Sequence, residues 1–167
     1  MMLSHRLPAS IAACRGLLAV VLLASAGLAQ AQFSMVPAPL PMSAPPRPSE
    51  AEVDKEYRID AARHIYAMYP MRVFRGKLPP MMYAVMITDT ELDPTGNVVA
   101  VTVAREPAAA KEVSPWVVAL IRRAGPFPAP AKMRDTANPA GNIVYRDIWL
   151  VDKSGLFQVD TLTEGQR

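Results

Sequence analysis

The stretch VSPWVVALIRRAGPFPAP, residues 113–130, predicts one helix with a defined start and a sharp stop. Ser114 is a favoured N-cap residue, and Pro115 suits the first helical position, where its missing N–H costs nothing. Gly125 is expected to adopt the left-handed conformation that ends many helices, and the proline after it prevents continuation. We therefore expect a helix over residues 116–124 that divides the chain into two parts.

The apolar and basic residues of this helix indicate where it packs. Apolar side chains recur on one face at Val117, Leu120, Ile121 and Ala124. A helix that lies on a membrane surface carries several basic residues along its polar face. Here Arg122 and Arg123 both fall in the last turn, where positive charge favours the helix dipole. This distribution favours a core helix over a membrane-surface helix.

On either side of the helix the sequence repeats one pattern, which is a strand, an Asp-x-x-Gly turn and a second strand. Residues 81–92 alternate between two faces, and residues 98–105 are rich in β-branched side chains. Between them, Asp93-Pro94-Thr95-Gly96 fits a type I turn. The carboxyl-terminal copy runs from Ile143 to Val151, through Asp152-Lys153-Ser154-Gly155, and from Leu156 to Thr163. Each copy predicts an antiparallel hairpin.

An earlier helix completes the predicted domain. Ser49-Glu50-Ala51-Glu52 fits a capping box. Apolar residues then recur at helical spacing as far as Met68, and Pro70 disfavours helix in the residue before it. The order of elements predicts an α+β fold over residues 49–167, in which a small antiparallel sheet of two hairpins packs against one or two helices.

Residues 1–31 have the pattern of a secretory signal peptide. Basic residues precede the apolar run Gly16–Leu28, and Ala29-Gln30-Ala31 supplies the small residues that a signal peptidase requires. The run has 13 residues, fewer than the roughly 20 that cross a bilayer as a helix. We expect cleavage before Gln32 and secretion, with an uncleaved membrane anchor as the alternative.

Residues 32–48 are rich in proline, which lacks the main-chain N–H and fixes its φ angle, so this segment cannot form a helix or a central strand. In a polyproline II conformation the part from Val36 to Pro48 would reach about 40 Å. The composition predicts a disordered tether, which either holds the domain away from a membrane or has no function of its own.

The mature sequence offers little for catalysis, metal binding or cofactors. Cys14 is the only cysteine and lies in the signal peptide, so we expect no disulfide, thiol nucleophile or cysteine metal site. His64 has no partner at metal-ligand spacing and is expected to face solvent or to cap a helix. Asp89, Glu91 and Asp93 alternate like calcium ligands, but the Gly and Glu that a calcium loop requires are missing. We expect a protein that is not an enzyme and binds no cofactor.

The charge of the mature chain gives no indication of nucleic-acid binding. Two of the 18 basic residues lie in the signal peptide, which leaves 16 against 15 acidic residues. No cluster of Lys and Arg with interleaved aromatic residues remains. We therefore expect no nucleic-acid partner, and membrane contact only if the signal peptide is retained.

A set of turn, strand and helix segments matches a known arrangement. The segments are Asp93–Val98, Val99–Val103, Val117–Ile121, Phe127-Pro128-Ala129-Pro130 and Tyr145–Val151. Together they resemble the carboxyl-terminal domain of the TonB family of envelope energy transducers, which is structurally akin to that of TolA. The resemblance implies a periplasmic α+β domain of a Gram-negative cell. It also implies β-augmentation, in which a sheet edge pairs with a strand of an outer-membrane transporter or another envelope protein.

The resemblance places the candidate partner-binding edge on Ile143–Val151 or on its hairpin mate Leu156–Thr163. The candidate site residues along these two segments are Tyr145, Asp147, Trp149, Val151, Phe157, Val159 and Thr161. The leading hypothesis is a periplasmic protein-binding module that recruits an envelope protein through a sheet edge.

Two other functions remain open from the sequence. A membrane-anchored TonB-type energy transducer for outer-membrane transport would use the apolar run and the tether. TonB-like transducers have a longer spacer and a Ser/His face within their membrane helix, whereas Ser4 and His5 precede the apolar run here. A periplasmic hydrolase would use carboxylates such as Asp89 and Glu91.

Overall fold

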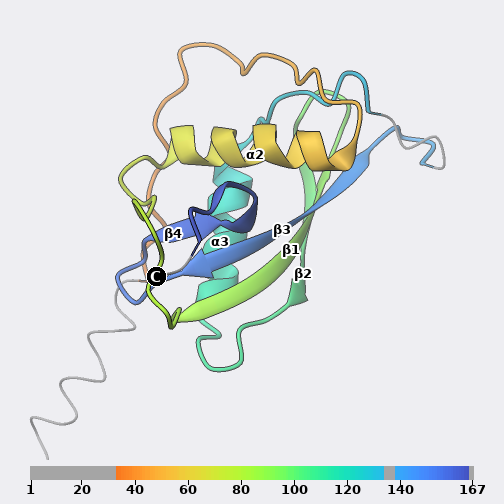
Figure 1. The fold of residues 1–167 in the computed structure, drawn as a ribbon. Coiled ribbons are helices and arrows are strands. Elements are labelled where there is room, and N and C mark those ends of the chain that lie inside the picture. The colour runs from red at the N-terminus through yellow and green to blue at the C-terminus, as the bar shows by residue number, and fades with distance from the viewer. Residues whose placement is uncertain (1–32, 134–137, 166–167) are drawn as a thin grey trace, which may run out of the picture.

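The computed structural model describes residues 33–133 and 138–165 of the chain. Its elements are α2 (Asp54–Met68), β1 (Ala84–Leu92), β2 (Val98–Arg105), α3 (Val113–Ala124), β3 (Ile143–Val151), β4 (Phe157–Val159) and the 3-10 helix η1 (Asp160–Leu162) (Figure 1). The predicted signal peptide and its apolar run lie outside the described residues. Within the described ranges, no helix combines the length and the apolar character needed to cross a bilayer.

The four strands form one antiparallel sheet in the order β2-β1-β3-β4 (Figure 1). Strand β1 pairs with β3 along its whole length, from Ala84 opposite Val151 to Leu92 opposite Ile143. The two hairpins therefore meet through β1 and β3. The predicted α+β fold, with a small antiparallel sheet and two helices, is confirmed.

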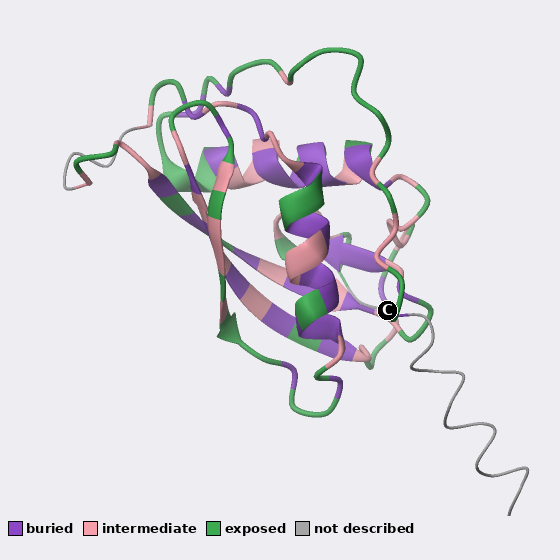
Figure 2. Cartoon of the chain, turned by 180° about the vertical axis from the view of Figure 1, so that it is seen from behind, coloured by how far each residue is buried: buried purple, intermediate pink, exposed green. Residues whose placement is uncertain are grey.

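One face of the sheet is buried under the two helices. Alternate residues of β1 and β3 are buried, and Figure 2 shows this alternation along both strands. On the buried face Tyr145 of β3 meets Tyr57 of α2, with ring centroids 5.6 Å apart. Phe157 of β4 meets Trp116 of α3, with ring centroids 6.4 Å apart. Both helices thus pack on the same face, and the core lies between them and the sheet.

The opposite face of the sheet is open and carries charged residues. Arg146 of β3 donates two hydrogen bonds of 2.7 Å to the carboxylate of Asp89 on β1. Glu91 accepts a 2.7 Å hydrogen bond from the side-chain amide of Asn142. Both carboxylates are engaged by neighbours on the open face, which gives the hydrolase hypothesis no support.

Both hairpin turns are built around the carboxylate of their first residue, as the Asp-x-x-Gly pattern predicts. Asp93 accepts hydrogen bonds from the main-chain N–H groups of Thr95 and Asn97 at 2.8 and 2.9 Å. Asp152 accepts one from the N–H of Ser154 at 2.7 Å. Desolvation raises the pKa of Asp93, but the hydrogen bonds from Thr95 and Asn97 outweigh it and lower the pKa to about 2. The ionised form of this carboxylate is the one that closes the turn.

The first turn also contacts the segment that follows α3. Gly96 has a φ of 90°, and its carbonyl accepts a 2.8 Å hydrogen bond from the N–H of Phe127. A Cβ at position 96 would lie 2.1 Å from the carbonyl oxygen of Phe127, so only glycine fits this approach. The turn therefore fixes the direction in which the chain leaves α3.

The start of α2 differs from the capping box that the sequence predicts. The helix begins at Asp54, with Val53 at the cap position and no side-chain cap. Ser49 is instead buried, where its hydroxyl donates to Asp60 at 2.6 Å and accepts from the N–H of Ala51 at 3.2 Å. A tertiary contact has replaced the predicted cap.

Helix α3 also differs from expectation at both ends. It begins at Val113, and the hydroxyl of Ser114 is buried inside the first turn with no hydrogen-bond partner among the described residues. Gly125 has φ −62° and ψ 153°, so the predicted left-handed end is wrong. Its extended conformation leads through a cis Gly125–Pro126 peptide bond to Phe127, which pairs with the first hairpin turn.

The last predicted strand is shorter than expected. Residues 156–163 form a strand only over Phe157–Val159, because the chain then turns into η1. Thr161 in η1 donates its hydroxyl to the carboxylate of Asp147 at 3.0 Å. β4 therefore covers only Trp149–Val151 of β3.

Residues 33–48, here called the strap, lie against the domain. Phe33 is only 7% exposed and belongs to the core. The N–H of Leu40 donates to the carbonyl of Met68 at 2.9 Å. Figure 1 shows the strap rising beside the domain and arching over α2. In the described residues the strap therefore contacts the domain at Phe33 and Leu40.

Candidate partner-binding site

The residues predicted to form a partner-binding edge lie mostly in the core. The buried ones are Tyr145, Asp147, Trp149, Val151, Phe157 and Val159, and Thr161 in η1 is half-buried. Strand β3 lies between β1 and β4, and it has an unpaired edge only where β4 does not extend beside it. Alternation places Tyr145, Asp147, Trp149 and Val151 on the helix face of the sheet, where a partner cannot reach their side chains.

The orientation of β4 shows which way the main chain of β3 faces. Phe157 directs its N–H to the carbonyl of Arg72 and its carbonyl to the N–H of Phe74, both at 2.8 Å and both away from β3. Successive residues of an antiparallel strand turn these groups to opposite sides. Gln158 therefore faces β3, where Leu150 is its partner.

Beyond the end of β4, part of β3 has no strand beside it. Val144, Arg146 and Ile148 share the orientation of the residue that pairs with β4, but β4 does not extend to them. The main-chain N–H of Ile148 is engaged by a hydrogen bond to the carboxylate of Asp147. The outward main-chain groups of Val144 and Arg146 have no strand partner in the described ranges. This side of Ile143–Ile148 is here called the open edge of β3.

Two hollows flank the open edge on the side of α2. One, of about 330 Å³, lies at the start of β3 and is lined by Glu52, Val53, Asp54, Lys132, Met133, Ile143 and Val144. The other, of about 180 Å³, lies between α2 and η1 and is lined by Lys55, Arg58, Ile59, Asp160 and Thr161. The hollows leave space along the open edge for an added chain.

A buried carboxylate lies at the inner end of the open edge. Asp147 accepts a hydrogen bond from Thr161 at 3.0 Å and lies 3.4 Å from the guanidinium of Arg58. Desolvation raises the pKa of Asp147 to about 6, against the opposing effects of the Thr161 hydrogen bond and the Arg58 charge. Asp147 therefore joins β3 to α2 and η1 at a free-energy cost that depends on pH.

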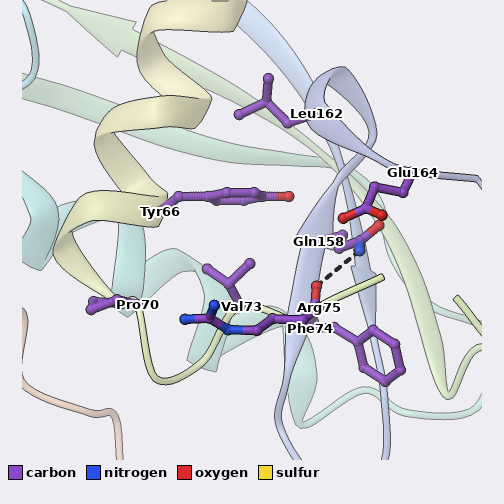
Figure 3. A pocket seen from close by; sticks show the side chains of 8 residues that line it. All are labelled: Tyr66, Pro70, Val73, Phe74, Arg75, Gln158, Leu162 and Glu164. Atoms are coloured by element: carbon purple, nitrogen blue, oxygen red, sulfur yellow. Dashed lines mark hydrogen bonds between the residues drawn. The ribbon is translucent and has the colours of Figure 1, made fainter. Parts of the chain in front are cut away.

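Another hollow, of about 290 Å³, lies near the carboxyl-terminal end of α2 (Figure 3). Gln158 donates from its side-chain amide to the carbonyl oxygens of Phe74 and Gly76 at 2.9 and 2.7 Å. The hydroxyl of Tyr66 accepts a 3.0 Å hydrogen bond from the N–H of Val159. These contacts hold the loop after α2 to β4, so these polar groups serve the fold.

His64 is a capping residue, one of the two roles expected for it. Its Nε2 lies 2.8 Å from the carbonyl oxygen of Ala124, the last residue of α3, and its ring lies 4.9 Å from that of Phe127. Desolvation lowers the pKa of His64, against the hydrogen bond with Ala124. In the described ranges, no group of three or more His, Cys, Asp or Glu side chains is placed to hold a metal ion.

Comparisons with protein-family models, with curated proteins and with solved structures find no match to this chain. The resemblance to the TonB family therefore stays a prediction from sequence segments. The fold itself defines a small α+β domain whose two helices cover one face of a four-stranded antiparallel sheet.

Proposed function

We propose that the chain is a periplasmic protein-binding module of the cell envelope, which recruits an envelope protein by strand addition at the open edge of β3. The observation that carries this proposal is that β4 pairs with only three of the nine residues of β3. An unpaired row of N–H and C=O groups is a template for a further strand. The resemblance to the TonB family supports the periplasmic setting and this mode of binding.

The regularity of β3 favours it over the other edge strand. The pairing of β1 with β2 shifts register between Ile87 and Thr88 and again between Glu91 and Leu92. Bulges of this kind are one way in which edge strands avoid pairing with other chains. The pairing of β1 with β3 has no register shift, so the open edge of β3 presents a regular row of main-chain groups.

The open edge sets the length and chemistry of the partner strand. At ~3.3 Å per residue, Ile143–Ile148 offers about 20 Å, which suits a strand of five or six residues. Val144 is 58% exposed on the open face of the sheet, and Lys55 and Arg58 line the helix side. Because Asp160 lines the helix side together with Lys55 and Arg58, a strand that alternates apolar and polar residues fits both sides.

Proline substitution at the open edge tests the proposal. Val144→Pro removes an outward N–H group and leaves the hydrogen bonds to β1 in place, because the main chain of Val144 faces away from β1. We expect the capture of an envelope protein by the mature chain, measured by pull-down from an envelope extract, to fall about tenfold or more.

The matched control lies on the opposite edge of the sheet. By the same alternation, the main-chain groups of Thr90 face its partner Tyr145 on β3. Val101, which lies opposite Thr90 on β2, therefore turns its N–H outward. Val101→Pro should leave capture unchanged, with both variants checked for folding by circular dichroism. Capture that survives Val144→Pro, or that is lost with Val101→Pro instead, contradicts binding at the open edge of β3.

A further inference from the structure

Phe33 occupies an aromatic seat that three separate parts of the chain build. Its ring stacks on Tyr83 with centroids 5.8 Å apart and planes 13° apart. It meets the ring of Trp116 edge-on, with centroids 5.3 Å apart and planes 88° apart. The β3–β4 turn completes the seat at Gly155, where a Cβ would lie 4.0 Å from the Phe33 ring. The seat is therefore made by the domain and filled by the strap.

Beyond Phe33, the domain holds the strap through main-chain hydrogen bonds and through the side chain of Val36, which packs against the core. The indole N–H of Trp116 donates to the carbonyl of Met35 at 3.3 Å, and Arg123 donates to the carbonyl of Val36 at 2.8 Å. Leu40 bonds through its N–H to α2. The side chain of Met35 points to solvent, at 79% exposure. Such contacts accept many sequences after the aromatic residue, because carbonyl groups are common to all of them.

We infer that this seat and the adjoining faces of α3 and α2 form a second peptide-binding site, whose ligand is an extended, proline-containing peptide led by an aromatic residue. Residues 33–40 are its resident occupant. They form no helix or strand, and an extended segment rich in proline loses little conformational entropy on binding. The site lies apart from the open edge of β3 and does not depend on strand addition.

The covalent link explains why a separate peptide would compete poorly in the intact chain. A segment joined to its own site acts at an effective concentration in the millimolar range. A peptide from another chain therefore occupies the site only when the strap is weakened or displaced. Weakening the strap at one contact should raise the affinity of the site for a peptide added in trans.

The experiment uses the full mature chain and a fluorescent synthetic peptide of residues 32–40, QFSMVPAPL. Two variants weaken the strap without changing the site, namely Phe33→Ala, which empties the seat, and Val36→Ala, which shortens a side chain that packs against the core. We expect each to bind the peptide with a Kd about tenfold or more below that of the unaltered chain, measured by fluorescence anisotropy.

Met35→Ala is the matched control, because Met35 also lies in the strap but its side chain is 79% exposed. It should bind the peptide as weakly as the unaltered chain does. The same peptide with alanine in place of Phe33 should not bind any variant.

Three results would overturn the inference. They are equal Kd values for Val36→Ala and Met35→Ala, no gain of binding in either strap variant, and equal binding of the alanine-substituted peptide. If Phe33→Ala unfolds the domain, as circular dichroism would show, Val36→Ala still decides, because the side chain of Val36 is only half-buried. Val144→Pro should bind the peptide as the unaltered chain does, which separates this site from the open edge.

Discussion

Asp147 is a buried carboxylate whose own contribution to the stability of the fold is larger in acid than at neutral pH. Its pKa is about 6 in the folded chain and about 3.9 in an unfolded chain, so the folded state binds the proton more tightly. The stabilisation from this proton is fully present below about pH 4 and is lost as the pH rises through about 6. The difference corresponds to on the order of 3 kcal/mol of unfolding free energy.

Asp147→Asn should remove this pH dependence. We expect the variant to gain about 2–3 kcal/mol of unfolding free energy relative to the unaltered chain between about pH 4 and 7, because asparagine does not ionise. Urea denaturation at both pH values measures the difference. Asp89→Asn is the control, since the hydrogen bond from Arg146 lowers the pKa of Asp89 and its stabilisation is lost as the pH falls. A difference between Asp147→Asn and the unaltered chain that does not change with pH would contradict the prediction.

At Gly96 the addition of one Cβ atom would produce a clash with the main chain of Phe127. Gly96→Ala should cost about 2–4 kcal/mol of unfolding free energy, because it adds left-handed strain and places a Cβ against the carbonyl of Phe127. Gly76→Ala is the control, since Gly76 also has positive φ but nothing lies within 4 Å of its Cβ position. It should cost about 1 kcal/mol. Equal losses in thermal or urea unfolding would show that the approach of Phe127 is not tight.

At the scale of elements, the sequence predicted the strands and turns that depend on hydrogen bonds between residues close together in the chain. Residues 98–105 and 143–151 are strands as expected, and both Asp-x-x-Gly turns form because the carboxylate and glycine suffice to close them. The ends of α2 and α3 were missed, because Ser49 bonds to Asp60 in the second turn of α2 and the chain after Gly125 bonds through Phe127 to Gly96. Such partners leave no signal in a short window of sequence.

The strap is the element whose behaviour differs most from its composition. If it were a tether, all its amides would exchange with solvent at similar, unprotected rates. We expect the Leu40 amide, which donates to Met68, to exchange more slowly than that of Ala38, for which no main-chain hydrogen bond is described. Hydrogen exchange followed by NMR measures both. Equal rates would indicate that the strap detaches readily from α2.

For the whole molecule, the sequence predicted two hairpins but not how they join. Alternation shows which residues share a face, yet it cannot show that β3 pairs with β1 and becomes an inner strand. The sequence therefore pointed to the side chains of Tyr145 and Trp149, which are buried, whereas the unpaired groups are the main-chain groups of Val144 and Arg146. Nor could composition show that Phe33 fills a seat, because the residues of that seat are spread over the chain.

The docking of the strap also shortens the distance that the amino-terminal part of the chain can span. Between Leu28, where the apolar run ends, and Phe33, the first residue that the structure describes, lie four residues that span about 14 Å at most. A chain that kept its apolar run in the inner membrane would thus hold the domain close to the bilayer surface. Undocking the strap as far as Pro48 would add about 50 Å of extended chain. In such an anchored chain, a partner that displaces Phe33 would therefore also set how far from the bilayer the domain can reach.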